Sequence, residues 1–239
     1  MTRTPASAAQ PARKTVAFVL YPGITLLDLV GPLTVFTSLT RFGLGFEVAV
    51  VGAHTGTMST DTPLSVSADR TYAEVPAPYL LCVPGGEEPT LRALADATLL
   101  DYVRTASAAA TWTTSVCTGS LILGEAGLLA GRRATTHWMF RDRLTAFGAV
   151  PVAERWVEDG DVITAAGVSA GIDMALHVVD LIAGDTVAKA IQTGIEYDPQ
   201  PPHGPIDWAA TDLAACAPMT EAMLTTALAD HPALLAKLR

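Results

Sequence analysis

Basic residues are scarce in this chain of 239 residues, which has 15 lysines and arginines against 24 aspartates and glutamates. The net charge of −9 repels phosphate backbones and anionic membrane surfaces, and no basic patch offsets it. The Arg132-Arg133 pair is too short for a nucleic-acid footprint and is interpreted as a solvated turn. We therefore expect neither nucleic acid nor a membrane as a partner.

Cysteine is also sparse, and Cys82, Cys117 and Cys216 show neither CxxC spacing nor Cys/His ligand spacing. The sequence thus predicts no disulfide framework, no metal site and a reducing, cytoplasmic location. No apolar run has membrane-spanning length, and the N-terminal segment lacks the apolar core of a secretory signal. We expect residues 1–13 to form a flexible tail and residues 14–239 to form one domain.

Only 16% of the residues are charged, whereas 50% are hydrophobic. This balance excludes long disordered segments and indicates that some apolar surface is hidden in an oligomer. A homodimer is the simplest expectation. The sequence contains no internal repeat.

Short apolar runs alternate along the chain with runs of helical period. Strands are predicted over residues 15–21, 46–52, 79–86, 111–116 and 133–138, and hairpins within 58–75 and 155–167, the second turning at Asp159-Gly160. Helices are predicted over 24–36 with an irregularity at Gly31-Pro32, and over 91–109, 119–131, 138–147, 169–184 (capped by Ser169) and 233–239. This alternation predicts an α/β fold with a mainly parallel sheet and helices on both faces.

Ligands bind such sheets at the carboxyl ends of the strands, where the sequence offers Asp28, the turn 84–86 and Cys117. Cys117 lies between a predicted strand that ends at Val116 and a helix that begins near Gly119. This elbow directs the thiol into the crevice at the positive end of the helix, and both effects favour a thiolate. The alternative is a small buried hydrophobe, which is how we interpret the other two cysteines.

The residues around this elbow allow further roles. Thr118 could donate a hydroxyl hydrogen bond to the sulfur or to a reacting atom, and Gly119 lets backbone N–H groups approach closely. His137 is either a base or a packing residue. Asp28, among leucines and valine, is either a proton donor and acceptor with a raised pKa or a helix N-terminal aspartate that satisfies backbone N–H groups.

Five segments together resemble the DJ-1/PfpI superfamily and, within it, the isonitrile hydratases. They are YPGITLLDLVGPLTVF, VPGG, SVCTGSLILGEAGLLAGRRATTHW, GVSAGIDMALHVV and GIEYDPQPP, in order from about residue 14 to 202. The resemblance implies a flavodoxin-like α/β sandwich, class I glutamine amidotransferase-like and usually homodimeric. It assigns the nucleophile to Cys117, the neighbouring hydroxyl to Thr118 and the active-site carboxylate to Asp28. We add Gly86, Gly119 and His137 as substrate-binding candidates.

The activity that the resemblance implies is hydration of an isocyanide to an N-substituted formamide. It would proceed through a covalent Cys117 thioimidate with Asp28 as general acid and base, and would need no metal or organic cofactor. Thr118 stands where protease-like members have histidine, which argues against a Cys-His peptidase. Residues 87–89, Glu-Glu-Pro, replace a further glycine and change one wall of the pocket.

Two other functions fit similar sequences. AraC-like regulators of this superfamily use such a module to sense ligands, but the roughly thirty-five residues after Pro205 carry little positive charge and are too few for two helix-turn-helix units. A ligand sensor that does not bind DNA remains an alternative. Glyoxalase-like or deglycase-like chemistry on carbonyl compounds is the other.

Overall fold

The central feature of the computed structural model, which describes residues 13–239, is a seven-stranded sheet. Its order is β10 (Trp156–Asp159), β11 (Val162–Ala165), β7 (Trp112–Ser115), β6 (Leu80–Val83), β1 (Lys14–Val19), β2 (Phe46–Gly52) and β5 (Arg70–Thr71). Every neighbouring pair is parallel except β10 and β11. The expected mainly parallel α/β sheet is confirmed.

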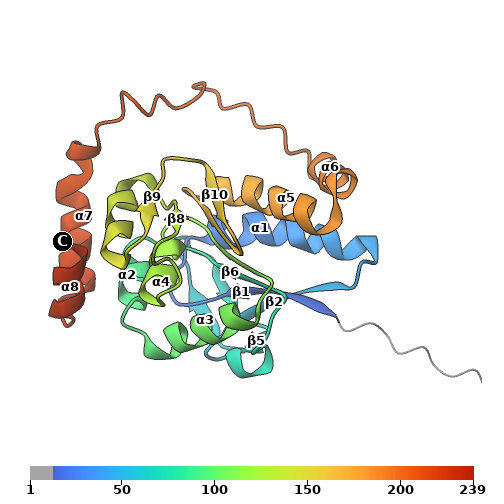
Figure 1. Ribbon diagram of the computed structural model, residues 1–239, viewed down its shortest axis with the longest axis horizontal. Coiled ribbons are helices and arrows are strands. Elements are labelled where there is room, and N and C mark those ends of the chain that lie inside the picture. Colours follow the sequence, from blue (N-terminus) through green and yellow to red (C-terminus); the bar gives the residue numbers. More distant parts are fainter. Residues whose placement is uncertain (1–12) are drawn as a thin grey trace, which may run out of the picture.

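Helices cover both faces of this sheet (Figure 1). One layer holds α1 (Leu26–Leu39), α5 (Ala170–Ala183) and α6 (Asp185–Gly194), which pack against one another. The other holds α2 (Glu88–Ala93), α3 (Ala97–Ala109) and α4 (Gly119–Glu125). Because both faces are covered, β6 and β11 are buried along their whole length, as their apolar and β-branched residues require.

Smaller elements surround the sheet. The expected hairpin within residues 58–75 is confirmed as β3 (Thr57–Ser59) and β4 (Ser65–Ser67). A two-stranded sheet joins β8 (Arg133–Ala134) to β9 (Val150–Pro151), and two 3₁₀ turns, Thr40–Phe42 and Tyr72–Glu74, complete the connections. In the described residues, no helix is long and apolar enough to cross a membrane.

Several predicted elements differ in extent. The helix predicted over 91–109 is two helices, because the Asp96 side chain accepts a hydrogen bond from the N–H of Leu99 (3.1 Å) and starts α3 afresh. The strand predicted over 133–138 shrinks to β8, and residues 138–147 form a 3₁₀ helix, η3 (Trp138–Phe147), rather than an α-helix. The helix predicted from 119 ends at Glu125, because Gly127 takes a left-handed backbone (φ 83°).

Other local expectations also need correction. α1 continues through Gly31 and Pro32 to Leu39, because its packing against the sheet and α5 holds it across the proline. Ser169 precedes α5, but its hydroxyl lies beside Arg155 (3.3 Å from Nη2) and does not cap the helix. The β10–β11 turn falls one residue later than predicted, at 160–161. Of the predicted tail, residues 1–12 lie outside the described residues, and Arg13 forms an ion pair with Glu47 (3.2 Å).

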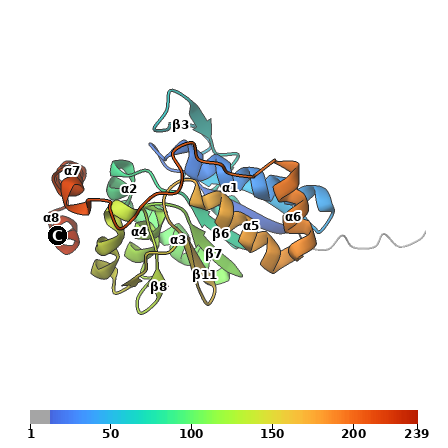
Figure 2. The ribbon, with the colours of Figure 1, turned by 90° about the horizontal axis from the view of Figure 1, so that it is seen from above.

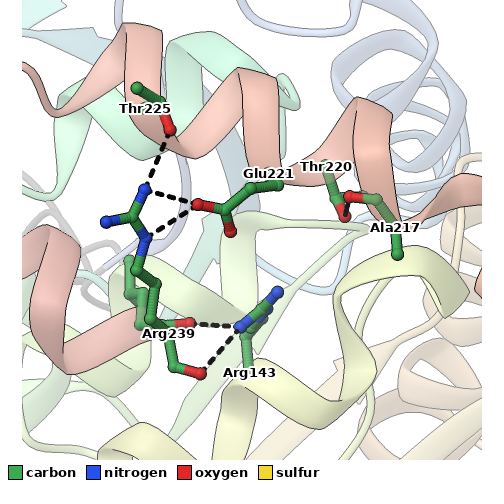
Figure 3. A network of polar contacts seen from close by, with 7 residues as sticks. Arg143, Ala217, Thr220, Glu221, Thr225 and Arg239 are labelled. Carbon is green, nitrogen blue, oxygen red and sulfur yellow. Dashed lines mark hydrogen bonds and ion pairs between the residues drawn. The ribbon is translucent and has the colours of Figure 1, made fainter.

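The C-terminal part crosses the molecule. After α6 the chain runs as a non-helical arm, residues 195–212, and reaches α7 (Leu213–Ala227) and α8 (Pro232–Leu238) at the opposite end (Figures 1 and 2). The terminal helix was predicted, whereas α6 and α7 were not. Figure 3 shows how the end is held: Arg143 of η3 donates to the carbonyl of Leu238 (2.6 Å), and Arg239 donates to Glu221 (2.7 Å).

Candidate functional site

The carboxyl ends of three adjacent strands meet at one edge of the sheet. The segments that follow β1, β6 and β7 bring together Tyr21, the turn 84–86 and Cys117, and Asp28 reaches the same place from the first turn of α1. The sheet order reverses around β1, so this edge is the crevice where doubly wound sheets bind ligands. The three places singled out in the sequence are thus brought together.

Cys117 occupies a strained elbow between β7 and α4. Its φ of 56° is a left-handed conformation that non-glycine residues rarely adopt. Its N–H donates to the carbonyl of Ala166 (3.0 Å), and its carbonyl accepts from the Thr136 hydroxyl (2.8 Å). A Cβ on Gly119 would clash with the Val83 carbonyl, so only glycine allows the chain to turn this closely against β6.

The Asp28 carboxyl lies against the thiol of Cys117 in a fully buried position. Oδ2 accepts a hydrogen bond from the N–H of Gly85 (3.0 Å), while Oδ1 is buried without a partner among the described residues. Asp28 does not accept from the N–H groups of its own helix, so the alternative role as a helix N-terminal aspartate is not observed. The free oxygen leaves one atom of the carboxyl available to a thiol, a substrate or a water.

Burial governs the proton affinities of this pair. It raises the pKa of Asp28 from 3.8 to about 7, although the hydrogen bonds from Gly85 and Cys117 act in the opposite direction. Burial, and then the nearby Asp28 carboxylate, raise the pKa of the Cys117 thiol well above its usual value. The N–H groups of Val168 and Thr118, which hydrogen bond to the sulfur, act against this rise.

The expectation of a thiolate is therefore wrong for the resting site. α4 is only seven residues long, and its positive end does not offset the loss of solvation and the neighbouring carboxylate. The raised pKa that the sequence suggested for Asp28 is confirmed. Burial and the neighbouring carboxylate thus favour the protonated thiol, beside a carboxyl whose own pKa is raised to about 7.

Thr118 anchors a buried chain of hydroxyl groups. Its Oγ1 accepts hydrogen bonds from the N–H groups of Gly86 and Glu87 (3.1 Å each) and lies 2.8 Å from the hydroxyl of Thr90. The Thr90 hydroxyl lies 2.9 Å from that of Tyr21, which in turn donates to the Pro84 carbonyl (2.9 Å).

This chain of hydroxyls has one polarity. Because Tyr21 donates to a carbonyl and Thr118 already accepts twice, the protons run from Thr118 to Thr90 to Tyr21. The Thr118 hydroxyl therefore points away from the sulfur, and the expected donation to a reacting atom is not observed. Its backbone N–H faces the sulfur instead.

A cavity of about 650 Å³ abuts the elbow. It is lined by Thr136, Ala166 and Val168, all of which contact Cys117, but Cys117 and Asp28 are not among the residues that line it. His137 also lines the cavity, with Nδ1 buried and without a partner in the described residues. Burial lowers its pKa, so it is neutral near pH 7.

The remaining glycine candidate, Gly86, holds the turn after β6. Its N–H binds Thr118, and a Cβ would press on the Gly23 carbonyl (2.9 Å). The segment 87–89, expected to alter a pocket wall, contributes the N–H of Glu87 to Thr118 and then opens α2. None of its residues lines the cavity.

Sequence reasoning missed Tyr21, Thr90 and the far wall of the cavity. Tyr21 and Thr90 carry no motif of their own, and only the fold brings them to Thr118. The far wall comes from Trp138 and Arg141 of η3, from the arm between residues 206 and 211, and from Leu213 at the start of α7, which are distant in the sequence from Cys117. No three His, Cys, Asp or Glu side chains gather as metal ligands anywhere in residues 13–239.

Comparison with known proteins finds relatives that share most of this chain. The chain is 39% identical over 209 residues to the isonitrile hydratase of Pseudomonas putida, and the match covers 87% of each protein. It is 32% identical over 177 residues to the HTH-type transcriptional regulator CdhR of Pseudomonas aeruginosa, covering 73% of this chain and 52% of the regulator. A ThiJ/PfpI family protein from Pseudomonas syringae superposes with a TM-score of 0.81 at 34% identity and covers 98% of both chains.

The DJ-1/PfpI family model matches residues 14–181, which contain every strand of the main sheet, the Cys117 elbow and Asp28. The family-level expectation drawn from the sequence is confirmed by this match and by the two full-length relatives. The chain belongs to the DJ-1/PfpI family.

Proposed function

We propose that this protein is an isonitrile hydratase that converts an isocyanide and water into an N-substituted formamide. The observation that carries the proposal is the buried Asp28 carboxyl, with one oxygen free, against the Cys117 thiol. A carboxyl with a pKa of about 7 exchanges protons readily near neutral pH, which suits a general acid and base. The 39% identity to the hydratase of Pseudomonas putida supports the same chemistry.

In the first step the sulfur of Cys117 bonds to the terminal carbon of the isocyanide. The Asp28 carboxylate accepts the thiol proton and delivers it to that carbon, so S–H adds across the carbon and gives a thioimidate, S–CH=N–R. Starting from a neutral thiol is no obstacle, because the carboxylate removes the proton as the new bond forms. The proton thus passes between two groups that already touch.

In the second step water adds to the same carbon. Asp28 takes one proton from the water, and the nitrogen gains a proton, which leaves a tetrahedral carbon bearing S, OH and NHR. The C–S bond then breaks, the hydroxyl becomes the formamide carbonyl, and its proton returns through Asp28 to the sulfur. The N–H groups of Val168 and Thr118 hydrogen bond to the departing sulfur and stabilise its developing charge.

The substituent of the isocyanide would occupy the cavity, because Thr136, Ala166 and Val168 contact Cys117 and also line that space. The neutral His137 would offer its free Nδ1 to this part of the substrate. No step in this scheme calls for a metal or an organic cofactor. Water and a lipophilic isocyanide are the proposed substrates.

The test is formamide production from a simple aryl isocyanide, with the Cys117→Ala variant beside the native protein. We expect turnover by the native protein and none by the variant, whose fold is checked by circular dichroism. Turnover by both would contradict the covalent route. If neither makes formamide, consumption of methylglyoxal tests the glyoxalase-like alternative. Binding of the aryl isocyanide measured by calorimetry, without turnover, would favour a ligand sensor.

A further inference from the structure

The charged residues that line the cavity are not equivalent. Glu154 is paired with Arg133 (2.9 Å), and Arg155 is paired with Asp173 and contacts Ser169. Arg141 has neither a hydrogen-bond partner nor an ion-pair partner within residues 13–239. Once the paired charges are set aside, one positive charge remains on the cavity wall.

The environment of Arg141 makes this unpaired charge informative. Its side chain is half-buried in the wall that η3 contributes, where an arginine without a carboxylate loses solvation and gains no compensating partner. Water and dissolved ions stabilise the charge of a fully exposed arginine. They stabilise less completely the charge of an arginine that faces a largely apolar cavity. The arrangement therefore favours a ligand that brings its own negative charge.

The residues beside Arg141 define the rest of such a ligand. Trp138 of η3 and Trp208 of the arm both line the cavity, with ring centroids 6.1 Å apart. Leu27 and Ile206 add aliphatic surface. These side chains offer an apolar surface against which an aromatic or branched body could pack while its anionic end meets Arg141.

We infer that Arg141 is a specificity-determining residue that selects isocyanides with an apolar body and an anionic group, such as a carboxylate, on the substituent. This inference rests on the proposed function for the reacting end of the molecule. The anionic group is recognised by a charge-assisted hydrogen bond from the guanidinium, which also draws the substrate into the cavity. The same interaction holds the formamide product, which keeps the anionic group.

The experiment compares 4-isocyanobenzoate with its uncharged methyl ester on native protein, Arg141→Gln and Arg41→Gln. Arg41 is exposed in the 3₁₀ turn Thr40–Phe42, outside the cavity, and its replacement removes the same charge. For Arg141→Gln we expect kcat/KM for the carboxylate to fall about tenfold to hundredfold, mainly through KM. We expect kcat/KM for the ester to change by less than about twofold, and Arg41→Gln to behave as native.

A fall of equal size for both substrates, or no fall for the carboxylate, would overturn the inference. A separate measurement distinguishes its failure from that of the proposed function. Calorimetry with 4-formamidobenzoate and its methyl ester reports binding without turnover. If the native protein hydrates neither isocyanide, the proposed function fails, yet selective binding of the carboxylate that disappears in Arg141→Gln would still establish the anion site. Equal binding by both proteins would refute it.

Discussion

At the residue scale, the proton shared between Asp28 and Cys117 sets the expected pH dependence of the reaction. The proposed mechanism needs Asp28 ionised and Cys117 protonated. Because the pKa of Asp28 is raised to about 7, the active form accumulates as the pH rises through 7. We expect kcat/KM for an aryl isocyanide to rise with a midpoint near pH 7 and to level off above it.

The Asp28→Asn variant provides the control for this profile. It retains an acceptor for the N–H of Gly85 but cannot exchange a proton. Its residual rate, which we expect to be lower by about a hundredfold or more, should show no step near pH 7. A step of the same midpoint in the variant would assign the titration to another group.

The Thr118 hydroxyl gives a second prediction, on stability. In Thr118→Val the N–H groups of Gly86 and Glu87 lose their acceptor, so the free energy of unfolding should fall by roughly 2–4 kcal/mol. In Thr118→Ser the hydroxyl and both hydrogen bonds remain, and we expect a loss below about 1 kcal/mol. Urea unfolding of both variants and of the native protein measures these two losses in the free energy of unfolding. Equal losses in the two variants would mean that the hydroxyl contributes no more to stability than the methyl group that serine lacks.

At the element scale, the elbow between β7 and α4 stores backbone strain. The φ of 56° at Cys117 costs a non-glycine residue about 1 kcal/mol, which glycine avoids. We therefore expect Cys117→Gly to be more stable than Cys117→Ala by about that amount, although neither has a thiol. Comparison of their melting temperatures under identical conditions checks this, and a more stable alanine variant would argue against strain at the elbow.

The network in Figure 3 makes a prediction for the C-terminal helices. Arg143→Met removes the hydrogen bonds to the carbonyls of Leu238 (2.6 Å) and Arg239 (3.3 Å). Because the network is partly exposed, the global loss should be below about 1 kcal/mol, whereas α8 should exchange its amide hydrogens faster. Arg104→Met removes a comparable exposed pair on α3, and faster exchange of α8 in that variant would refute a local effect.

Many of the strands and helices were predictable from the sequence, because the buried strands of a parallel sheet are continuous apolar runs. β6 and β11 are such runs, and each lies close to its predicted place. The break before α3 was missed because its signal is the single cap Asp96 inside a continuous helical period. The 3₁₀ form of η3 was missed because its apolar spacing resembles that of an α-helix.

At the scale of the whole molecule, the buried carboxyl of Asp28 should make stability fall as pH rises. Its pKa is about 7 in the folded protein and 3.8 in the unfolded chain, so the folded state holds the proton more tightly. The contribution of Asp28 to the free energy of unfolding is largest below about pH 4, declines between about pH 4 and 7, and is constant above. The total decline is on the order of 4 kcal/mol. Denaturant unfolding of the native protein and of Asp28→Asn should be measured across this pH range. The free energy of unfolding should decline with pH in the native protein and not in the variant, and the same pH dependence in both would contradict the prediction.

The candidate site was predictable in part, since Cys117, Asp28 and the turn 84–86 follow strands or open a helix at one edge of the sheet. The direction of the Thr118 hydroxyl was not, because it depends on Tyr21 and Thr90, which the fold brings in from β1 and α2. Nor was the cavity wall at Arg141, which forms only when the arm crosses back over η3. The homodimer, the cytoplasmic location and the extent of the single domain stay predictions.

The depth at which the three cysteines lie has a practical consequence for labelling studies. Cys82 and Cys117 are almost entirely buried, whereas Cys216 on α7 is half-exposed. A bulky thiol reagent will therefore modify Cys216 first, and the stoichiometry of labelling will report on α7 rather than on Cys117. A protein that appears fully alkylated can therefore retain an unmodified Cys117, so a chemical probe for this residue must be small enough to reach it from the cavity.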